Sequence, residues 1–452
     1  MLDPLAVYLF DLDGVLITSG GYNAALKATV NHFARKMGLG EAAPDDSAIE
    51  TFAVQGIGLE WDSSAICLSA LMLELWKADR GLRLAGDFAH MLSATAARRP
   101  AQPVIDYKAL ALRVAHATPP GGHAPLAAWR LLSDEANALE RGDRVREMQD
   151  ALHLVLSGTR DERISPTMRV IQHFTLGSSL YNEVYGQPAQ FETVSLLREF
   201  DRPTLSEREC RALESSMRRE GQRAAAYTLR LSRPLDVPTE GVEFAPEAEI
   251  ALETAGMAWL PLVGYGHVRW LAAQHQCAPD AFVKPSPVHA LAAIGRAVGG
   301  SERESLEAAF DLWDSGQVNE LLLGLRERPL TLHVFEDSAG SVRGVCKAAT
   351  LLCACGFKAE CRAYGIASSP EREAALRESG IAVYTRLEPA LRAAGLWFAE
   401  SNESRPSVPA GRRFAGGGAV PRRERERILP TCGTNQGATR RNFREKALVT
   451  RA

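Results

Sequence analysis

The sequence predicts an α/β protein: a doubly wound parallel sheet with a large, mainly α-helical segment inserted after the first strand. Residues 6–10 form a short apolar run typical of a buried parallel strand, and two acids and a glycine follow it. Residues 19–234 are dominated by apolar residues at three- and four-residue steps, which indicates helices. The second half alternates strand-like and helix-like segments, which favours parallel βα units.

The first strand ends in the octapeptide LFDLDGVL at residues 9–16, with Asp11 and Asp13 two positions apart. Open α/β sheets bind ligands at the carboxyl ends of their strands, and Gly14 permits the chain to turn there. One carboxylate can then attack a phosphorus atom while the other handles protons, and the pair attracts a hard cation such as Mg²⁺. The alternative is a strand end with an ordinary Asp-Gly turn.

The insertion should be built from amphipathic helices. We expect them at residues 22–37, 64–77, 124–139, 143–156, 166–175, 191–199 and 206–229. Residues 86–122 are rich in Ala, Arg, Pro and Gly and are expected to pack loosely. The aromatic segment 174–186 is either a seam between packed helices or a surface that faces a substrate.

The sheet resumes near residue 235, and two motifs in this half carry charged groups. AFVKPSP at 281–287 places Lys284, a compact positive charge suited to a phosphoryl group, ahead of a helix at 288–298. LTLHVFEDS at 330–338 ends a strand in Glu336 and Asp337. Acids at neighbouring strand ends repel one another unless a cation lies between them. The alternative is that Glu336, Asp337 and Ser338 cap the helix that follows.

These three segments, in this order, resemble the haloacid dehalogenase (HAD) superfamily, and in particular its phosphoglucomutase and phosphatase branch. The resemblance covers about residues 5–17 and 238–396. It implies a Rossmannoid catalytic core made of residues 1–18 and 235–400, and an enlarged helical cap at residues 19–234 that covers the site.

The resemblance also implies roles for particular residues. Asp11 would be the nucleophile and Asp13 the general acid and base. Mg²⁺ would be held by the Asp11 carboxylate, the Asp13 backbone carbonyl and Asp337, with Glu336 in or near the shell. Lys284 would bind both the phosphoryl oxygens and the Asp11 carboxylate.

One of the family's sequence motifs differs in this chain. The family carries a Ser or Thr at the end of its second motif strand, and the segment AWLPLVGYG at 258–266 places Gly264 there. The backbone amides of Gly264 and Leu12 would then complete the phosphate cradle, and Tyr265 is a candidate replacement hydroxyl.

The resulting hypothesis is a Mg²⁺-dependent phosphohydrolase that acts on a small phosphorylated metabolite through an aspartyl-phosphate intermediate. The alternative is a degenerate HAD-like protein that binds a phosphorylated ligand or a protein partner without efficient turnover. Gly264 and the long insertion favour that alternative, whereas the full set of charged residues favours the enzyme. The acids argue against dehalogenation, and a mutase stays open.

Composition indicates the class and the compartment. The chain has 452 residues, 46% of them hydrophobic, with neither a long uncharged apolar run nor a signal peptide at the N-terminus. We therefore expect a cytoplasmic protein without a membrane span, of open oligomeric state. Its eight cysteines include no Cys-x-x-Cys pair, so Cys346, Cys353, Cys355 and Cys361 are interpreted as buried reduced thiols rather than a zinc site.

The last segment differs in character. Residues 401–452 carry a formal charge of +8, whereas the whole chain carries −3. Their Gly, Pro, Ser, Thr and Arg content predicts a disordered tail. A basic tail can contact nucleic acid, but this one has no interleaved aromatic residues, so nucleic-acid binding is not favoured.

Overall fold

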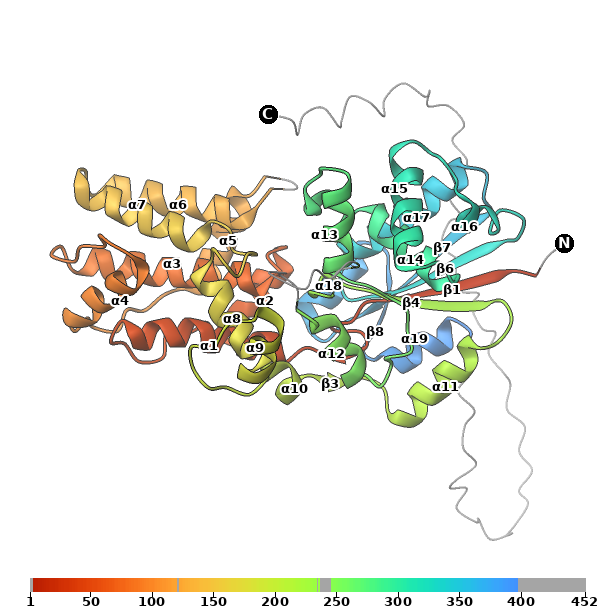
Figure 1. Cartoon of the computed structure of the whole chain (residues 1–452), viewed down its shortest axis with the longest axis horizontal. Helices are drawn as coiled ribbons and strands as arrows, with labels where there is room; N and C mark the ends of the chain where they lie inside the picture. The colour runs from red at the N-terminus through yellow and green to blue at the C-terminus, as the bar shows by residue number, and fades with distance from the viewer. Residues whose placement is uncertain (1–2, 120–121, 234, 236–244, 397–452) are drawn as a thin grey trace, which may run out of the picture. The chain divides into compact units, whose positions relative to one another are not determined.

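A computed structural model describes residues 3–119, 122–233, 235 and 245–396, and its centre is a six-stranded sheet (Figure 1). The strand order is β5-β4-β1-β6-β7-β8, and every neighbouring pair is parallel. The strands are β1 (Leu5–Phe10), β4 (Gln222–Tyr227), β5 (Leu262–Val263), β6 (Leu330–Glu336), β7 (Ala359–Ile366) and β8 (Ala382–Tyr384). The predicted α/β fold class is confirmed.

Helices cover both faces of this sheet, because alternate residues of β1 enter different cores. Val7 and Leu9 pack with α13 (Tyr265–Gln274), α14 (Pro287–Ala297), α15 (Glu302–Asp314) and α17 (Ala339–Ala354). Tyr8 and Phe10 pack with α11 (Glu207–Met217), α12 (Glu247–Thr254) and α19 (Leu387–Ala393). The shorter elements of this half are η1 (Pro279–Ala281), α16 (Glu320–Leu323) and α18 (Pro370–Glu378). The sheet is therefore doubly wound, as predicted.

The inserted segment is helical and has a hydrophobic core of its own. Its helices are α1 (Gly21–Lys36), α2 (Asp46–Val54), α3 (Glu60–Ala78), α4 (Phe88–Ala97), α5 (Tyr107–Ala117), α6 (Ala124–Leu139), α7 (Asp143–Leu156), α8 (Pro166–Leu176), α9 (Ser178–Tyr185) and α10 (Leu196–Phe200). The expectation of loose packing at 86–122 is wrong, since Met91, Tyr107 and Val114 are buried in this core. The segment 174–186 is a packing seam, where Tyr181 is buried and stacks on His173.

A short antiparallel ribbon marks where the chain leaves the sheet and returns to it. β2 (Ile17–Thr18) pairs with β3 (Arg202–Pro203), so the insertion lies between residues 19 and 201. The predicted boundary at residue 234 is wrong, because β4 lies between β5 and β1 in the sheet.

The same region contains the main error in the predicted secondary structure. The helix expected at 206–229 is in fact α11 followed by β4, and Gly221 with a φ of +78° precedes the strand. The alanines of β4 favour a helix in isolation. Pairing with β1 overrides that preference because Ala225 and Ala226 are fully buried there.

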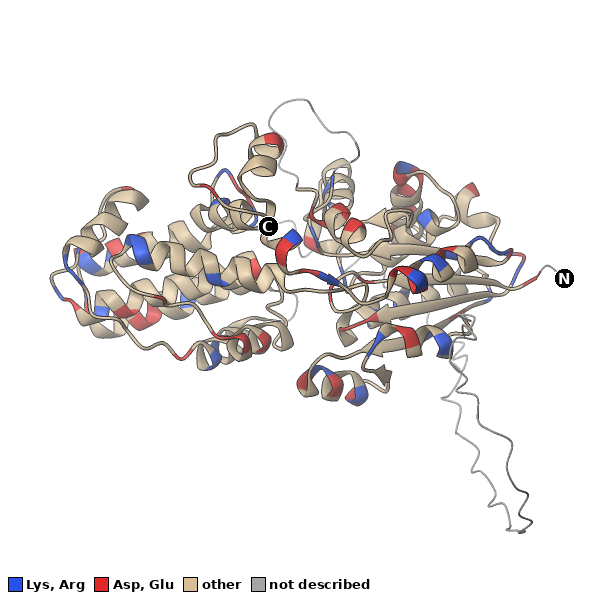
Figure 2. Ribbon diagram, turned by 90° about the horizontal axis from the view of Figure 1, so that it is seen from below, with Lys and Arg blue, Asp and Glu red and all other residues tan. Residues whose placement is uncertain are grey.

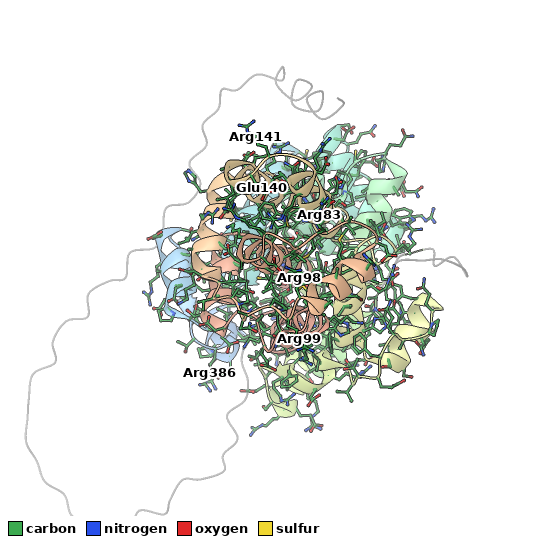
Figure 3. The ribbon with its side chains drawn as sticks, turned by 90° about the vertical axis from the view of Figure 1, so that its left-hand side faces the viewer. Arg83, Arg98, Arg99, Glu140, Arg141 and Arg386 are labelled. Atoms are coloured by element: carbon green, nitrogen blue, oxygen red, sulfur yellow. The ribbon has the colours of Figure 1, made fainter. Side chains whose placement is uncertain are left out.

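Charged residues of both signs are distributed over the helices of both regions (Figure 2). Figure 3 looks onto one side of the molecule, where Arg83, Arg98 and Glu140 are among the labelled side chains. Both of these arginines are neutralised by ion pairs, Arg83 by Glu147 and Arg98 by Asp79. The predicted basic tail at 401–452 lies outside the described residues.

Candidate active site at the carboxyl end of the central strand

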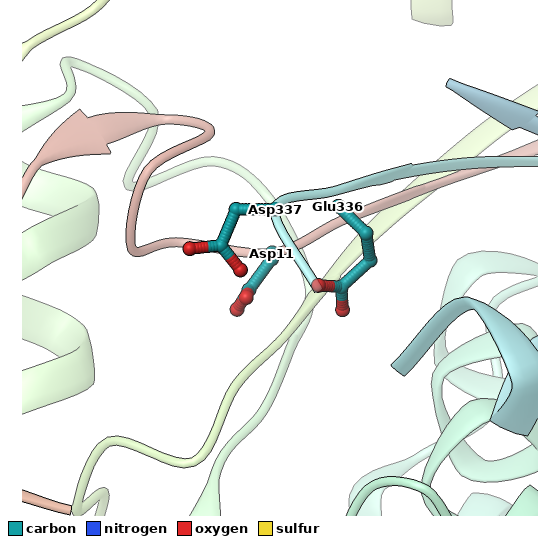
Figure 4. Close-up of side chains that lie close together, drawn as sticks. All are labelled: Asp11, Glu336 and Asp337. Carbon is teal, nitrogen blue, oxygen red and sulfur yellow. The ribbon is translucent and has the colours of Figure 1, made fainter. Parts of the chain in front are cut away.

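The two acidic motifs meet at one edge of the sheet because their strands are parallel neighbours. Asp11 follows β1 directly, and Asp337 follows β6, whose last residue is Glu336. One oxygen from each of these three carboxylates lies within 4.8 Å of the others (Figure 4). Gly14, with a φ of +74°, brings the β1 loop so close that an added Cβ would lie 2.9 Å from Asp337 Oδ2. The turn predicted at Gly14 therefore lets the two motifs approach.

Lys284 joins this group from the loop after η1. Its Nζ lies 2.8 Å from Asp11 Oδ1 and 2.7 Å from Glu336 Oε1, and its side chain is only 4% exposed. It also lies 3.9 Å above the ring of Tyr227, whose hydroxyl donates a 2.6 Å hydrogen bond to Glu336 Oε1. Burial alone would lower the pKa of Lys284, but Asp11 and Glu336 outweigh it and raise that pKa. Lys284 is thus a buried, protonated counter-ion.

The negative charge at this edge exceeds what Lys284 balances. Burial, and then the Glu336 carboxylate, raise the pKa of Asp11 to about 8, even though Lys284 opposes the shift. Glu336 is fully buried, and its Oε2 atom accepts no hydrogen bond from the described residues. A buried, unpartnered carboxylate oxygen beside two more carboxylates is a donor set that suits a hard divalent cation. The residues present therefore fit Mg²⁺.

An arginine already contacts one of the candidate metal ligands. Arg372, on α18, forms an ion pair with Asp337 and a second one with Glu50 of the inserted helix α2, at 3.0 Å. Ser369 Oγ also donates to Glu50, at 2.7 Å. Asp337 is thereby linked through one side chain to the insertion.

Asp13 belongs to a different group of charges. Arg230 Nε lies 2.9 and 3.1 Å from its two oxygens, and Ser19 donates to it as well. Arg230 is 1% exposed, pairs with the buried Asp201 at 2.9 Å, and lies over the ring of Tyr22. Burial alone would raise the pKa of Asp13, but the guanidinium of Arg230 holds it below its usual range. The Asp13 carboxylate is therefore not part of the three-carboxylate group.

The structure does not bring Gly264 and Tyr265 to this edge in the way predicted. They follow β5, which β4 separates from β1. The Gly264 amide donates to His267 Nδ1 and the Tyr265 amide to the Arg230 carbonyl, so neither is free to form a phosphate cradle. An added Cβ at Gly264 would lie 2.5 Å from Ser232, so the glycine is required by packing. The Leu12 amide does lie at the site, where it donates to Asp11 Oδ1 at 2.8 Å.

The hydroxyl residue that follows the strand next to β1 is Thr228. It follows β4, the strand that pairs with β1, and the register places Ala226 opposite Phe10. Thr228 therefore lies just beyond the level of Asp11, where its Oγ1 accepts a 3.1 Å hydrogen bond from the Arg230 amide. The signal in the sequence is a short apolar run that begins shortly after Gly221 and is followed by the hydroxyl residue Thr228. The alanines of this run favour a helix, and this is why the strand is missing from the prediction.

No family model matches the chain, and no curated protein matches it. Among solved structures, the chain is similar to the X-ray structure of a Northeast Structural Genomics Consortium target, ZR25. The TM-score is 0.55 at 14% identity, over 87% of this chain and 99% of that one. It also matches phosphatase Tt82 from Thermococcus thioreducens, with a TM-score of 0.39 at 15% identity, over 82% of this chain and 99% of that one. The first similarity bears on the fold alone, and the second is too weak to bear on either fold or function.

Within the described ranges, none of the helices combines the length and the apolar character needed to cross a lipid bilayer.

Proposed function

We propose that this chain is a Mg²⁺-dependent phosphohydrolase that acts on a small phosphorylated metabolite, with Asp11 as the nucleophile. One observation carries the proposal: the Asp11 carboxylate ends the central strand, touches Lys284, and lies within 4.8 Å of the oxygens of Glu336 and Asp337. A nucleophilic carboxylate, a fixed cation and extra acids for a metal ion are the groups that phosphoryl transfer through an aspartyl-phosphate requires. The doubly wound parallel sheet is compatible with a HAD-like phosphatase.

The chain's own residues divide the work. An Asp11 oxygen attacks the phosphorus, and Lys284 holds the phosphoryl oxygens against the surrounding acids. We assign to the hydroxyl of Thr228, at the neighbouring strand end, the role of a donor to the same phosphoryl group. Mg²⁺ would be held by Asp11 and Asp337, with Glu336 and the Asp13 carbonyl nearby, and would supply positive charge against the transferred group.

Proton transfer falls to Asp13, and this part of the site is the least prepared for catalysis. A general acid must carry a proton before the leaving group departs. Arg230 instead holds the Asp13 carboxylate in its ionised form. In the proposed cycle Asp13 first donates a proton to the leaving group, which requires the Arg230 contact to loosen on substrate binding, and then acts as the base that activates the water for hydrolysis of the aspartyl-phosphate.

Two ion pairs at the site favour a second candidate function. Arg230 is paired with Asp13, the proposed acid and base, and Arg372 is paired with Asp337, a candidate metal ligand. A degenerate protein that binds a phosphorylated ligand without turning it over would tolerate both contacts, whereas an enzyme has to displace or use them.

A hydrolysis screen separates the two candidates. Wild-type protein and Asp11→Asn are incubated with p-nitrophenyl phosphate, acetyl phosphate and a panel of phosphorylated metabolites, with Mg²⁺ or with EDTA. Mg²⁺-dependent turnover that Asp11→Asn abolishes supports the enzyme. If there is no turnover but Mg²⁺-dependent binding of beryllium fluoride, lost in Asp11→Asn, the binding protein is supported. If the protein shows neither turnover nor binding of beryllium fluoride, both candidates are contradicted.

A further inference from the structure

Four of the cysteines lie close together in the sequence, and the structure resolves them into one contacting pair. Cys346 Sγ, on α17, lies 3.2 Å from Cys361 Sγ, on β7. Cys353 instead bonds to the Ala359 carbonyl and Cys355 to the Gly316 carbonyl. The expectation that these thiols are buried is wrong for Cys346 and Cys353, which are exposed, whereas Cys355 and Cys361 are half-buried.

The geometry of this pair suits a disulfide. The two sulfurs belong to a helix and a strand packed against each other, and closing their separation by about 1 Å would bring them to bonding distance. Cys346 is open to solvent, so a soluble oxidant can reach it. The thiol of Cys361 can donate a hydrogen bond to the Cys346 thiolate, and this lowers the pKa of Cys346 to about 7 and favours the thiolate that attacks a disulfide.

We propose that Cys346 and Cys361 are a reversible redox pair that closes to an intramolecular disulfide by exchange with a low-molecular-weight disulfide such as oxidised glutathione. The Cys346 thiolate attacks one sulfur of oxidised glutathione, that S–S bond breaks, and one glutathione thiolate leaves. Cys361 then attacks the Cys346 sulfur and displaces the second glutathione. The protein gives up two protons and two electrons, and these convert oxidised glutathione into two thiols.

The disulfide would tie the middle of α17 to β7. Helix α17 begins at Ala339, directly after Glu336, Asp337 and Ser338. The disulfide would therefore anchor the helix that follows the candidate active site. Cys361 lies opposite Leu332, well before the end of β6, so closure should leave the three carboxylates and Lys284 themselves unchanged.

The full-length protein tests this proposal directly. Reduced protein is equilibrated in glutathione buffers of graded redox ratio, its free thiols are blocked, and it is digested with trypsin. Cleavage after Arg343, Lys347, Lys358 and Arg362 places Cys346 in the peptide GVCK and Cys361 in AECR, while the peptide between them holds the other two thiols. We expect a linked GVCK–AECR peptide, about 2 Da lighter than the two reduced peptides together, whose yield rises with oxidised glutathione and falls to zero with dithiothreitol.

Matched variants separate this pair from its neighbours. Cys346→Ser and Cys361→Ser should abolish the linked peptide, whereas Cys353→Ser and Cys277→Ser, which also change exposed thiols, should leave its yield unchanged. Closure should also raise the melting temperature of wild-type protein by about 2–5 °C relative to oxidised Cys346→Ser, because it closes a short loop in the unfolded chain. Mixed glutathione disulfides on Cys346 without the linked peptide, or Cys361 linked to another cysteine instead, would overturn the proposal.

Discussion

Asp11 and Asp13 are two residues apart in the sequence, yet their surroundings shift their pKa values in opposite directions. Burial and Glu336 raise the pKa of Asp11 to about 8, because Lys284 is shared between two acids. The pKa of Asp13 is lowered, because Arg230 contacts both of its oxygens. The comparison shows that the identity of a carboxylate says little about its charge, which depends on how many cations and acids share its pocket.

The Asp11 half of this comparison leads to the largest expected effect. Asp11→Asn should abolish Mg²⁺-dependent phosphatase activity, because a neutral amide is not a nucleophile towards phosphorus. The fold should persist, since the exchange is nearly isosteric and removes a destabilising like-charge contact. Steady-state kinetics and circular dichroism measure the two effects, with the exposed Asp314→Asn as the control. Substantial remaining turnover would mean that another residue is the nucleophile.

The next test removes Lys284, the cation that contacts Asp11. Lys284→Met leaves the buried Asp11 and Glu336 without their shared counter-ion. We expect a loss of about 3–5 kcal/mol in the free energy of unfolding and a fall in kcat/KM of at least about a hundredfold. Urea denaturation with and without Mg²⁺ measures the first effect. Lys347→Met, an exposed lysine on α17, should change neither quantity.

The lowered pKa of Asp13 is tested by changing Arg230, the arginine that contacts it. In Arg230→Lys the bidentate contact is lost but the positive charge stays, so the pKa of Asp13 should rise towards its usual value while the protein still folds. The acidic limb of the pH profile of kcat/KM should then move to higher pH. Profiles of variant and wild type that superimpose would show that Arg230 does not control the proton on Asp13.

A smaller effect is expected at the ion pair between Asp337 and Arg372. Asp337→Asn removes a candidate metal ligand and should raise the Mg²⁺ concentration needed for half-maximal activity by about tenfold or more. Arg372→Gln removes a competing cation and should lower that concentration by up to about fivefold, as one partly exposed ion pair of about 1 kcal/mol allows. Mg²⁺ titrations that shift in the same direction for both variants would contradict a metal at Asp337.

The last comparison concerns the pH dependence of stability rather than activity. Because the pKa of Asp11 is raised from 3.8 to about 8 in the folded state, the folded protein binds this proton more tightly than the unfolded chain. Its contribution favours folding below about pH 4 and is lost as the pH rises through about 8. Metal-free wild-type protein should therefore lose stability relative to Asp11→Asn between about pH 5 and pH 8. Urea denaturation across this range measures it, and a constant difference would rule out the shift.

Much of the site could be predicted from the sequence because its signals are local. A buried apolar run followed by acids marks a strand end at Asp11 and again at Asp337, and parallel topology brings such ends to one edge. Lys284 could be placed beside them through the family resemblance that the three segments carry together. The sequence also determined the fold class, since alternation of strands and helices in the second half admits few arrangements other than a doubly wound sheet.

Only the tertiary structure decided which groups pair. The alanines of β4 favour a helix until β1 and β5 lie beside them, so Thr228 and the true end of the insertion were missed and Gly264 was put in their place. Arg230 and Asp13 are more than two hundred residues apart, and nothing local in either segment indicates their contact. Charge pairing and strand partnership are long-range properties: they depend on which segments the fold brings together, and a sequence pattern records only the neighbours along the chain.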